Sequence, residues 1–218
     1  MNLIKRFISS IILLSILSLS ISIDHKYFNI FLILIFLLAL YEWLNLVKMT
    51  IHKLFGSFFL FLSFYSVFLL SDINNISSGT NLIILIIIIC VSSDIGGYVF
   101  GKILRGPKLT KISPNKTYSG VLGAYLFVAF SIFVISANEL IFFKKITFSN
   151  LLIIALLISS ISQIGDIIIS FFKRKAKIKD TGKLIPGHGG ILDRIDGMIF
   201  AFPFSLIFLH LCKLKKKL

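Results

Sequence analysis

A polar stretch, residues 171–198, interrupts a sequence that is otherwise rich in Ile, Leu and Phe. It reads FFKRKAKIKDTGKLIPGHGGILDRIDGM and combines many basic residues with three aspartates, a histidine and a Gly-Gly pair. Asp193 and Asp196 share one face of any helix that begins after the glycines, because they are three residues apart. Carboxylates beside Lys and Arg suit metal-assisted phosphoryl chemistry, since Mg²⁺ takes one or two carboxylates plus substrate phosphate oxygens. The stretch therefore predicts a site for phosphorylated substrates.

Two smaller features of this stretch, the PGHGG motif and its histidine, indicate what kind of ligand the site can bind. The motif PGHGG, residues 186–190, prevents a continuous helix, and the backbone N–H groups that it frees can point at an anion. Zinc does not fit, because His188 is the one histidine here and no cysteine is near. His188 is either an ordinary loop residue or a contact to a substrate phosphate.

A stripe of polar side chains leads into this stretch. Ser159, Gln163, Asp166, Ser170 and Lys173 are three or four residues apart, so they lie on one face of a helix. An aspartate at the centre of a membrane helix costs about 2.5–3.5 kcal/mol on an insertion scale, so it needs polar surroundings. We expect the stripe to face a bundle interior, either as an interhelical hydrogen-bond seam or as part of a functional site.

Another polar block spans residues 94–120 and begins with an aspartate inside an apolar segment. Gly97 and Gly101 give that segment a small-residue face, on which a second helix can pack closely. A basic connection follows, in which the candidates to hold phosphate oxygens are Ser113, Lys116 and Thr117.

The elements that must position these residues are membrane helices. The chain is 57% hydrophobic with a mean hydropathy of +0.98, which is typical of an integral membrane protein. Seven apolar segments approach or reach the length that crosses a bilayer core of about 30 Å. They are Phe7–Ile23, Tyr27–Leu46, Leu54–Leu70, Leu82–Phe100, Val121–Ala137, Phe148–Phe172 and Met198–Cys212. We expect an all-α polytopic membrane protein with about seven transmembrane helices and a polar cavity built from the C-terminal half.

The spans divide the chain into two parts. We expect residues 1–81 to form about three N-terminal spans, and residues 82–218 to form a catalytic transmembrane domain with polar cytoplasmic blocks at 94–120 and 166–197. Most of the Lys and Arg residues behind the net charge of +14 fall on one side of this arrangement, which the positive-inside rule identifies as the cytoplasm. They lack interleaved aromatic stacking positions, so no nucleic-acid partner is expected.

The run from Ser170 to Asp196 resembles the signature of the phosphatidate cytidylyltransferases, or CDP-diacylglycerol synthases. In that family S-x-x-K-R, K-D, P-G-H-G-G and D-R-x-D occur in this order and spacing, and SDIGGYVFGK and ISPNKTYSG resemble its other conserved region. The resemblance implies an enzyme of phospholipid biosynthesis in the bacterial inner membrane, with its site open to the cytoplasm. It would transfer cytidylyl from CTP to phosphatidic acid with Mg²⁺, and a second cation and a homodimer are left open.

The resemblance also assigns roles to individual residues. Asp166 and Asp193 are expected to bind the cation, with Asp196 near them. The residues expected to act in catalysis are Asp166, Asp193, Asp196, Lys173 and Arg174. The residues expected to bind the substrates are Ser113, Lys116, Lys179, Asp180, Lys183, His188, Gly189, Gly190 and Arg194.

Two positions depart from the family pattern. The family usually has Glu where this chain has Ile169, and often an acid or amide where it has Ser119. Ile169 is one helical turn from Asp166, so we expect it to face the cation site, where a glutamate would strengthen cation binding.

Two other functions are weighed against this one. A CTP-dependent lipid kinase of the polyprenol kinase type would need the same cation and CTP but would transfer the γ-phosphoryl group. An ion transporter could use Asp94 and Asp166 along its pathway, but it predicts internal repeats of the spans, which the sequence lacks.

Overall fold

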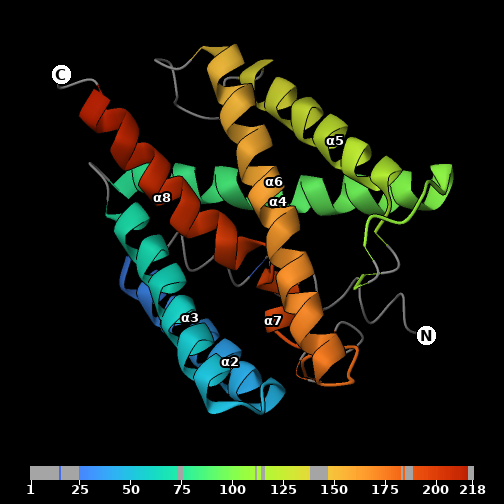
Figure 1. The fold of residues 1–218 in the computed structure, drawn as a ribbon. Coiled ribbons are helices and arrows are strands. Elements are labelled where there is room, and N and C mark those ends of the chain that lie inside the picture. The colour runs from blue at the N-terminus through green and yellow to red at the C-terminus, as the bar shows by residue number, and fades with distance from the viewer. Residues whose placement is uncertain are drawn as a thin grey trace.

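The structure is a computed structural model that describes residues 15, 25–72, 76–110, 112–113, 116–137, 147–182, 184 and 189–215. Within these ranges every regular element is a helix (Figure 1). In chain order the helices are α2 (His25–Leu46), α3 (Thr50–Ser71), α4 (Ile76–Leu104), α5 (Tyr118–Ala137), α6 (Phe148–Lys175), α7 (Leu192–Ile195) and α8 (Met198–Lys215). The prediction of an all-α fold is confirmed.

Several of these helices are suited to a bilayer, because a helix satisfies its backbone N–H and C=O groups internally where no water is available. Five are long and apolar enough to cross it: Lys26–Leu46, Thr50–Ser71, Gly79–Leu104, Tyr118–Ala137 and Phe148–Lys175. The apolar part of α8, Met198–His210, is shorter. The first expected span, Phe7–Ile23, lies outside the described residues except for Ser15.

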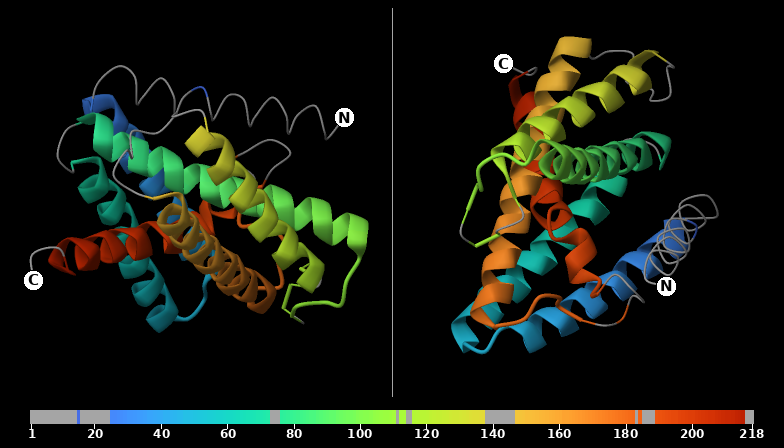
Figure 2. Two further views of the ribbon diagram at one scale, coloured as in Figure 1. Left: turned by 90° about the horizontal axis from the view of Figure 1, so that it is seen from above. Right: turned by 90° about the vertical axis from the view of Figure 1, so that its right-hand side faces the viewer.

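Helix α4 is central to the bundle. It packs against α3, α5, α6 and α8, and the views place α2 and α5 far apart, with α4, α6 and α8 between them (Figures 1 and 2). The expected small-residue face of α4 is confirmed, since Gly97 and Gly101 lie against Gly120 of α5. A methyl group on Gly97 would be 3.7 Å from the carbonyl oxygen of Gly120, so the two backbones approach closely.

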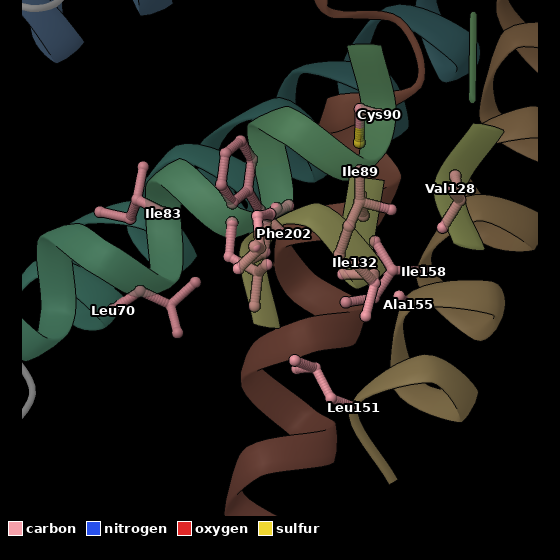
Figure 3. Packing of buried hydrophobic residues seen from close by; sticks show 14 of the residues in the cluster. Leu70, Ile83, Ile89, Cys90, Val128, Ile132, Leu151, Ala155, Ile158 and Phe202 are labelled. Atoms are coloured by element: carbon pink, nitrogen blue, oxygen red, sulfur yellow. The ribbon is translucent and has the colours of Figure 1, made fainter. Parts of the chain in front are cut away.

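Two apolar clusters hold the bundle together. In the larger one, Ile89 of α4, Ile132 of α5, Ile158 of α6 and Phe202 of α8 converge (Figure 3). The second joins α2, α3, α6, α7 and α8; its buried members are Ala39, Trp43, Leu46, Val47, Leu60, Ile169, Leu192 and Ile199. The short helix α7 is therefore fixed between the N-terminal helices and α6.

The C-terminal end of α6 is closed by a specific turn. Lys177 adopts a left-handed conformation with φ of 58°, and its N–H donates to the carbonyl of Arg174 at 3.0 Å. The N–H of Ile178 donates to the carbonyl of Lys173, also at 3.0 Å. This pair of bonds is a Schellman motif, which ends the helix and directs the chain toward α7.

Candidate active site

Lys116 lies in the connection between α4 and α5, which folds back on itself. The Leu109 N–H donates to the carbonyl of Lys116 at 2.8 Å, and the Lys116 N–H donates to the carbonyl of Ser113 at 3.0 Å. With its backbone fixed in this way, the Lys116 ammonium reaches α6. It lies 3.0 Å from Oδ2 of Asp166 and donates to the carbonyl of Gln163 at 3.2 Å. The structure thus brings together residues from both polar blocks.

The polar stripe of α6 faces the bundle interior, as predicted. The buried Ser159 donates to Oγ of Ser93 on α4 at 2.9 Å, and Nε2 of Gln163 donates to Oγ of Ser159 at 3.2 Å. Further along the stripe, Asp166 and Lys173 make their ion pairs with residues outside α6. The stripe is therefore a hydrogen-bond seam at Ser159 and Gln163, with ion pairs nearer its C-terminal end; its role in a functional site stays a prediction.

Lys173 connects α6 to α7 and the turn that follows it. Its ammonium lies 2.8 Å from Oδ1 of Asp193 and 3.9 Å from Oδ2 of Asp196. The side chains of Lys173 and Asp193 are only 11% and 5% exposed. At this burial each charge depends on its partner, because removing one leaves the other without compensation.

The carboxylate of Asp193 is engaged on both oxygens. Its Oδ2 accepts from the Thr181 N–H at 2.7 Å, the Thr181 hydroxyl at 3.0 Å and the Gly190 N–H at 3.0 Å, while Lys173 occupies Oδ1. Burial opposes ionisation, but Lys173 and the two amides outweigh it, so the pKa of Asp193 is below its ordinary value. Gly189, the residue before Gly190, has φ of 92°, which glycine adopts without strain. Asp193 acts here as an ionised anchor for the loop and for Lys173.

Asp166 and Asp196 lie side by side and form an acidic pair. Burial raises the pKa of Asp196 well above its ordinary value, the negative charge of Asp166 raises it further, and Lys173 opposes this effect. Two such carboxylates side by side are stabilised in their ionised form by a cation. No group of three or more His, Cys, Asp or Glu suited to a metal occurs in the part of the chain that the structure describes. A pair of carboxylates still fits Mg²⁺, which completes its shell with water and phosphate oxygens.

Glu42 of α2 is a site residue that the sequence analysis missed. It is 2% exposed, and its carboxylate accepts from the Ile191 N–H at 3.0 Å, the Leu192 N–H at 2.9 Å and the Thr181 hydroxyl at 2.8 Å. The signal that could have found it is the one that identified Asp166, a carboxylate inside an apolar span.

None of the ion pairs found among the described residues includes Arg174, Lys179 or Asp180. Arg174 is exposed, and its guanidinium donates to a backbone carbonyl of the following loop at 3.3 Å. Lys179 and Asp180 are exposed in the same loop. Lys183 and His188 lie outside the described residues.

The two departures from the family pattern have different surroundings. Ile169 is 5% exposed and packs with Trp43 and Leu192 in the second apolar cluster, so the expectation that it faces the cation site is wrong. It lies at the edge of the polar stripe, and the packing of α2 and α7 against that edge decides its environment. Ser119 accepts a hydrogen bond from the Gly106 N–H at 3.2 Å, which ties the loop before α5 to the start of that helix.

An apolar cavity of about 510 Å³ lies next to α7. Its walls come from α2, α3, α4, α7 and α8, and its polar lining consists of Ser63, Asp94 and Arg194. Ile191 and Ile195, on either side of Asp193 in the sequence, also line it. The short segment that carries Asp193 therefore borders both the ion pairs and an apolar space.

The sequence is similar to a known protein family and to individual proteins of that family. Residues 48–212 match the model of the cytidylyltransferase family. The phosphatidate cytidylyltransferase of Rickettsia typhi is 35% identical over 206 residues, covering 93% of this chain and 90% of that protein. The protein of the same name from Rickettsia prowazekii is also 35% identical over 206 residues, with the same coverage. The one from Brucella suis is 40% identical over 132 residues, which are 60% of this chain and 47% of that protein.

Proposed function

The chain belongs to the cytidylyltransferase family, and from this premise we propose that its polar centre makes CDP-diacylglycerol. The enzyme transfers the cytidylyl group of CTP to phosphatidic acid. A phosphate oxygen of phosphatidic acid attacks the α-phosphorus of CTP, and the bond from that phosphorus to the oxygen bridging it to the β-phosphate breaks. Pyrophosphate leaves, so the products are CDP-diacylglycerol and pyrophosphate.

The observation that carries this proposal is the position of α7 between the Lys173–Asp193 ion pair and the apolar cavity. Asp193 bonds Lys173 on one side, while Ile191 and Ile195 line the apolar cavity on the other. A lipid phosphate needs both environments, because its acyl chains must stay out of water while its phosphate meets a soluble nucleotide. We assign the cavity to acyl chain and the lining Arg194 to the lipid phosphate.

The basic residues would act on the charges of the reacting phosphates. Both substrates are polyanions, so they repel each other until positive charge holds them together. Lys116 and Lys173 are suited to this because carboxylates fix their ammonium groups before any substrate arrives. In-line transfer asks the protein for little more than positioning and charge stabilisation, which preorganised groups supply without reorganising.

We assign the cation to Asp166 and Asp196 instead of Asp166 and Asp193. Both oxygens of Asp193 are already bonded by Lys173, Thr181 and Gly190, so it would have to give up these bonds to bind a metal. When bound, Mg²⁺ would neutralise phosphate charge at this pair. The assignment keeps Asp193 as the residue that holds Lys173 in place.

The setting of the reaction follows from the same features. The protein is an integral membrane protein, and we propose that its polar centre opens to the cytoplasm, because the last turn of α6 carries Lys173, Arg174 and Lys175. The proposed catalytic residues fall within residues 82–218, which supports treating that part as the catalytic domain. The homodimer stays a prediction.

The deciding experiment incubates the purified protein with phosphatidic acid, Mg²⁺ and CTP labelled at the α-phosphorus. We expect the label in CDP-diacylglycerol and an equal amount of pyrophosphate. A lipid kinase would instead transfer the unlabelled γ-phosphoryl group, so the label would stay in CDP and no labelled lipid would form. Release of CDP without labelled lipid would therefore reject the cytidylyltransferase.

A further inference from the structure

Glu42 is a buried carboxylate that the reaction proposed above does not use. It comes from α2, ahead of the residues that match the family model, and it is 2% exposed. None of the ion pairs found among the described residues includes it. Its carboxylate instead accepts hydrogen bonds from the Ile191 and Leu192 amides and from the Thr181 hydroxyl. A carboxylate that accepts this many hydrogen bonds organises the groups that donate them.

The donors to Glu42 are the same backbone segments that hold Asp193. The Thr181 hydroxyl lies 2.8 Å from Oε2 of Glu42 and 3.0 Å from Oδ2 of Asp193, so one O–H stands between two carboxylates. The Leu192 amide, which donates to Glu42 at 2.9 Å, belongs to the residue immediately before Asp193. Gly190 donates to Asp193, and Ile191, the next residue, donates to Glu42. Glu42 and Asp193 are therefore linked through Thr181 and residues 190–192.

We infer that Glu42 is a positioning residue for the catalytic centre. It fixes Thr181 and residues 190–192 from the far side, which holds Asp193 where it can bind Lys173. The effect on catalysis rests on the proposed function, whereas the effect on the loop does not. Partners of this kind, which orient the residues that contact the reacting groups, are worth about 10- to 100-fold in activity.

The chemistry of the contact identifies the informative substitution. Glu42→Gln keeps the size of the side chain but replaces one acceptor oxygen by an NH₂ group. The Ile191 N–H donates to Oε1 and the Leu192 N–H donates to Oε2, so in either orientation this NH₂ would face a backbone N–H with no acceptor between them. Asp72→Asn is the matched control, because it makes the same acid-to-amide change at an exposed position after α3.

The test combines a double-mutant cycle with hydrogen–deuterium exchange of the purified full chain. We expect Glu42→Gln to lower kcat by about 10- to 100-fold, and Asp72→Asn to leave it within about two-fold. If Glu42 acts through Asp193, adding Glu42→Gln to Asp193→Asn should cost little more than Asp193→Asn alone. The amides of residues 181 and 190–192 should exchange faster in Glu42→Gln than in the unsubstituted protein.

The outcomes separate the inference from the proposed function. The positioning role would be overturned if the losses of kcat in the two single variants multiplied in the double variant. It would also be overturned if Glu42→Gln left both kcat and amide exchange unchanged. If the unsubstituted protein makes no CDP-diacylglycerol, the function fails, but faster exchange in Glu42→Gln would still establish that Glu42 holds the loop. Should Glu42→Gln not fold, Thr181→Val removes only the shared hydroxyl, and full activity in that variant would reject the link between the two carboxylates.

Discussion

Lys116 and Asp166 are 50 residues apart in the chain, yet the Lys116 ammonium lies 3.0 Å from Oδ2 of Asp166. The contact joins the loop between α4 and α5 to the polar stripe of α6. It places a positive charge beside the acidic pair before substrates arrive. The proposed function requires both signs of charge in one place, because the centre would hold two polyanions and a cation.

Replacing Lys116 should therefore remove substrate binding and rate together. We expect Lys116→Met to lower kcat/KM for CTP by about 100-fold or more, the order seen when a preorganised charge-stabilising group is lost. Lys102→Met is the control, since Lys102 is an exposed residue in the last turn of α4. Equal rates for the two variants would show that Lys116 serves only the loop.

The acidic pair should control the dependence on Mg²⁺. We expect Asp166→Asn and Asp196→Asn each to lower kcat by at least about 100-fold and to raise the Mg²⁺ concentration for half-maximal rate. Both variants should still insert, because neutralising a charge favours the membrane. Undiminished CDP-diacylglycerol synthesis in excess EDTA would contradict this assignment.

Asp193→Asn should behave differently, because Asp193 anchors Lys173. We expect loss of the buried ion pair to destabilise the protein by about 3–5 kcal/mol and to lower kcat by about 100-fold. The Mg²⁺ concentration for half-maximal rate should stay within a few-fold of the original value. A strong shift in that concentration would instead indicate that Asp193 binds the cation, as the sequence analysis predicted.

Position 169 provides a test of packing. Ile169 is buried among apolar side chains, and Lys173, one helical turn away, is already paired with Asp193. Ile169→Glu would therefore bury a carboxylate that competes with Asp193 for Lys173, so we expect a marked fall in melting temperature and in yield. Ile169→Val, which only removes a methylene, should cost about 0.5–1.5 kcal/mol. A stable Ile169→Glu variant with a lower Mg²⁺ requirement would mean that this position opens to the cation after all.

The cavity can be tested by filling it. Ile87 of α4 lines the cavity, whereas Ile103 of the same helix is 72% exposed. We expect Ile87→Trp to raise KM for phosphatidic acid at least about 10-fold, since the indole would take the space of acyl chain, with KM for CTP nearly unchanged. Ile103→Trp should change neither constant. Equal effects of Ile87→Trp on both substrates would argue against an acyl site.

Much of the fold was predictable from local sequence. Apolar segments of bilayer length must be helical, because only helices satisfy their own backbone in hydrocarbon, and the described spans agree with the expected ones. The spacing of Ser159, Gln163 and Asp166 likewise fixed which side of α6 faces inward. These features depend on residues a few positions apart, so they can be identified from one segment at a time.

The parts that were missed depend on distant contacts. Glu42 bonds the hydroxyl of Thr181, a residue 139 positions further on, and nothing in its own segment indicates that partner. Ile169 was misplaced because helical spacing puts it at the edge of the polar stripe, where the neighbouring helices decide its surroundings. The proposal that Asp196, and not Asp193, binds the cation likewise rests on the hydrogen bonds to Asp193, which come from a loop without periodic structure.

The length of α6 has a consequence for the membrane around it. The helix has 28 residues, and at about 1.5 Å per residue it is longer than a hydrocarbon core of about 30 Å. The helix can fit by tilting or by extending its polar C-terminal end into the headgroup region, and a thicker bilayer would let it stand more upright. Because Lys173 is in the last turn, the tilt sets the depth at which its ion pair with Asp193 meets the water interface. The thickness of the lipid host, and not only its headgroups, would therefore adjust how readily a water-borne nucleotide reaches the lipid phosphate.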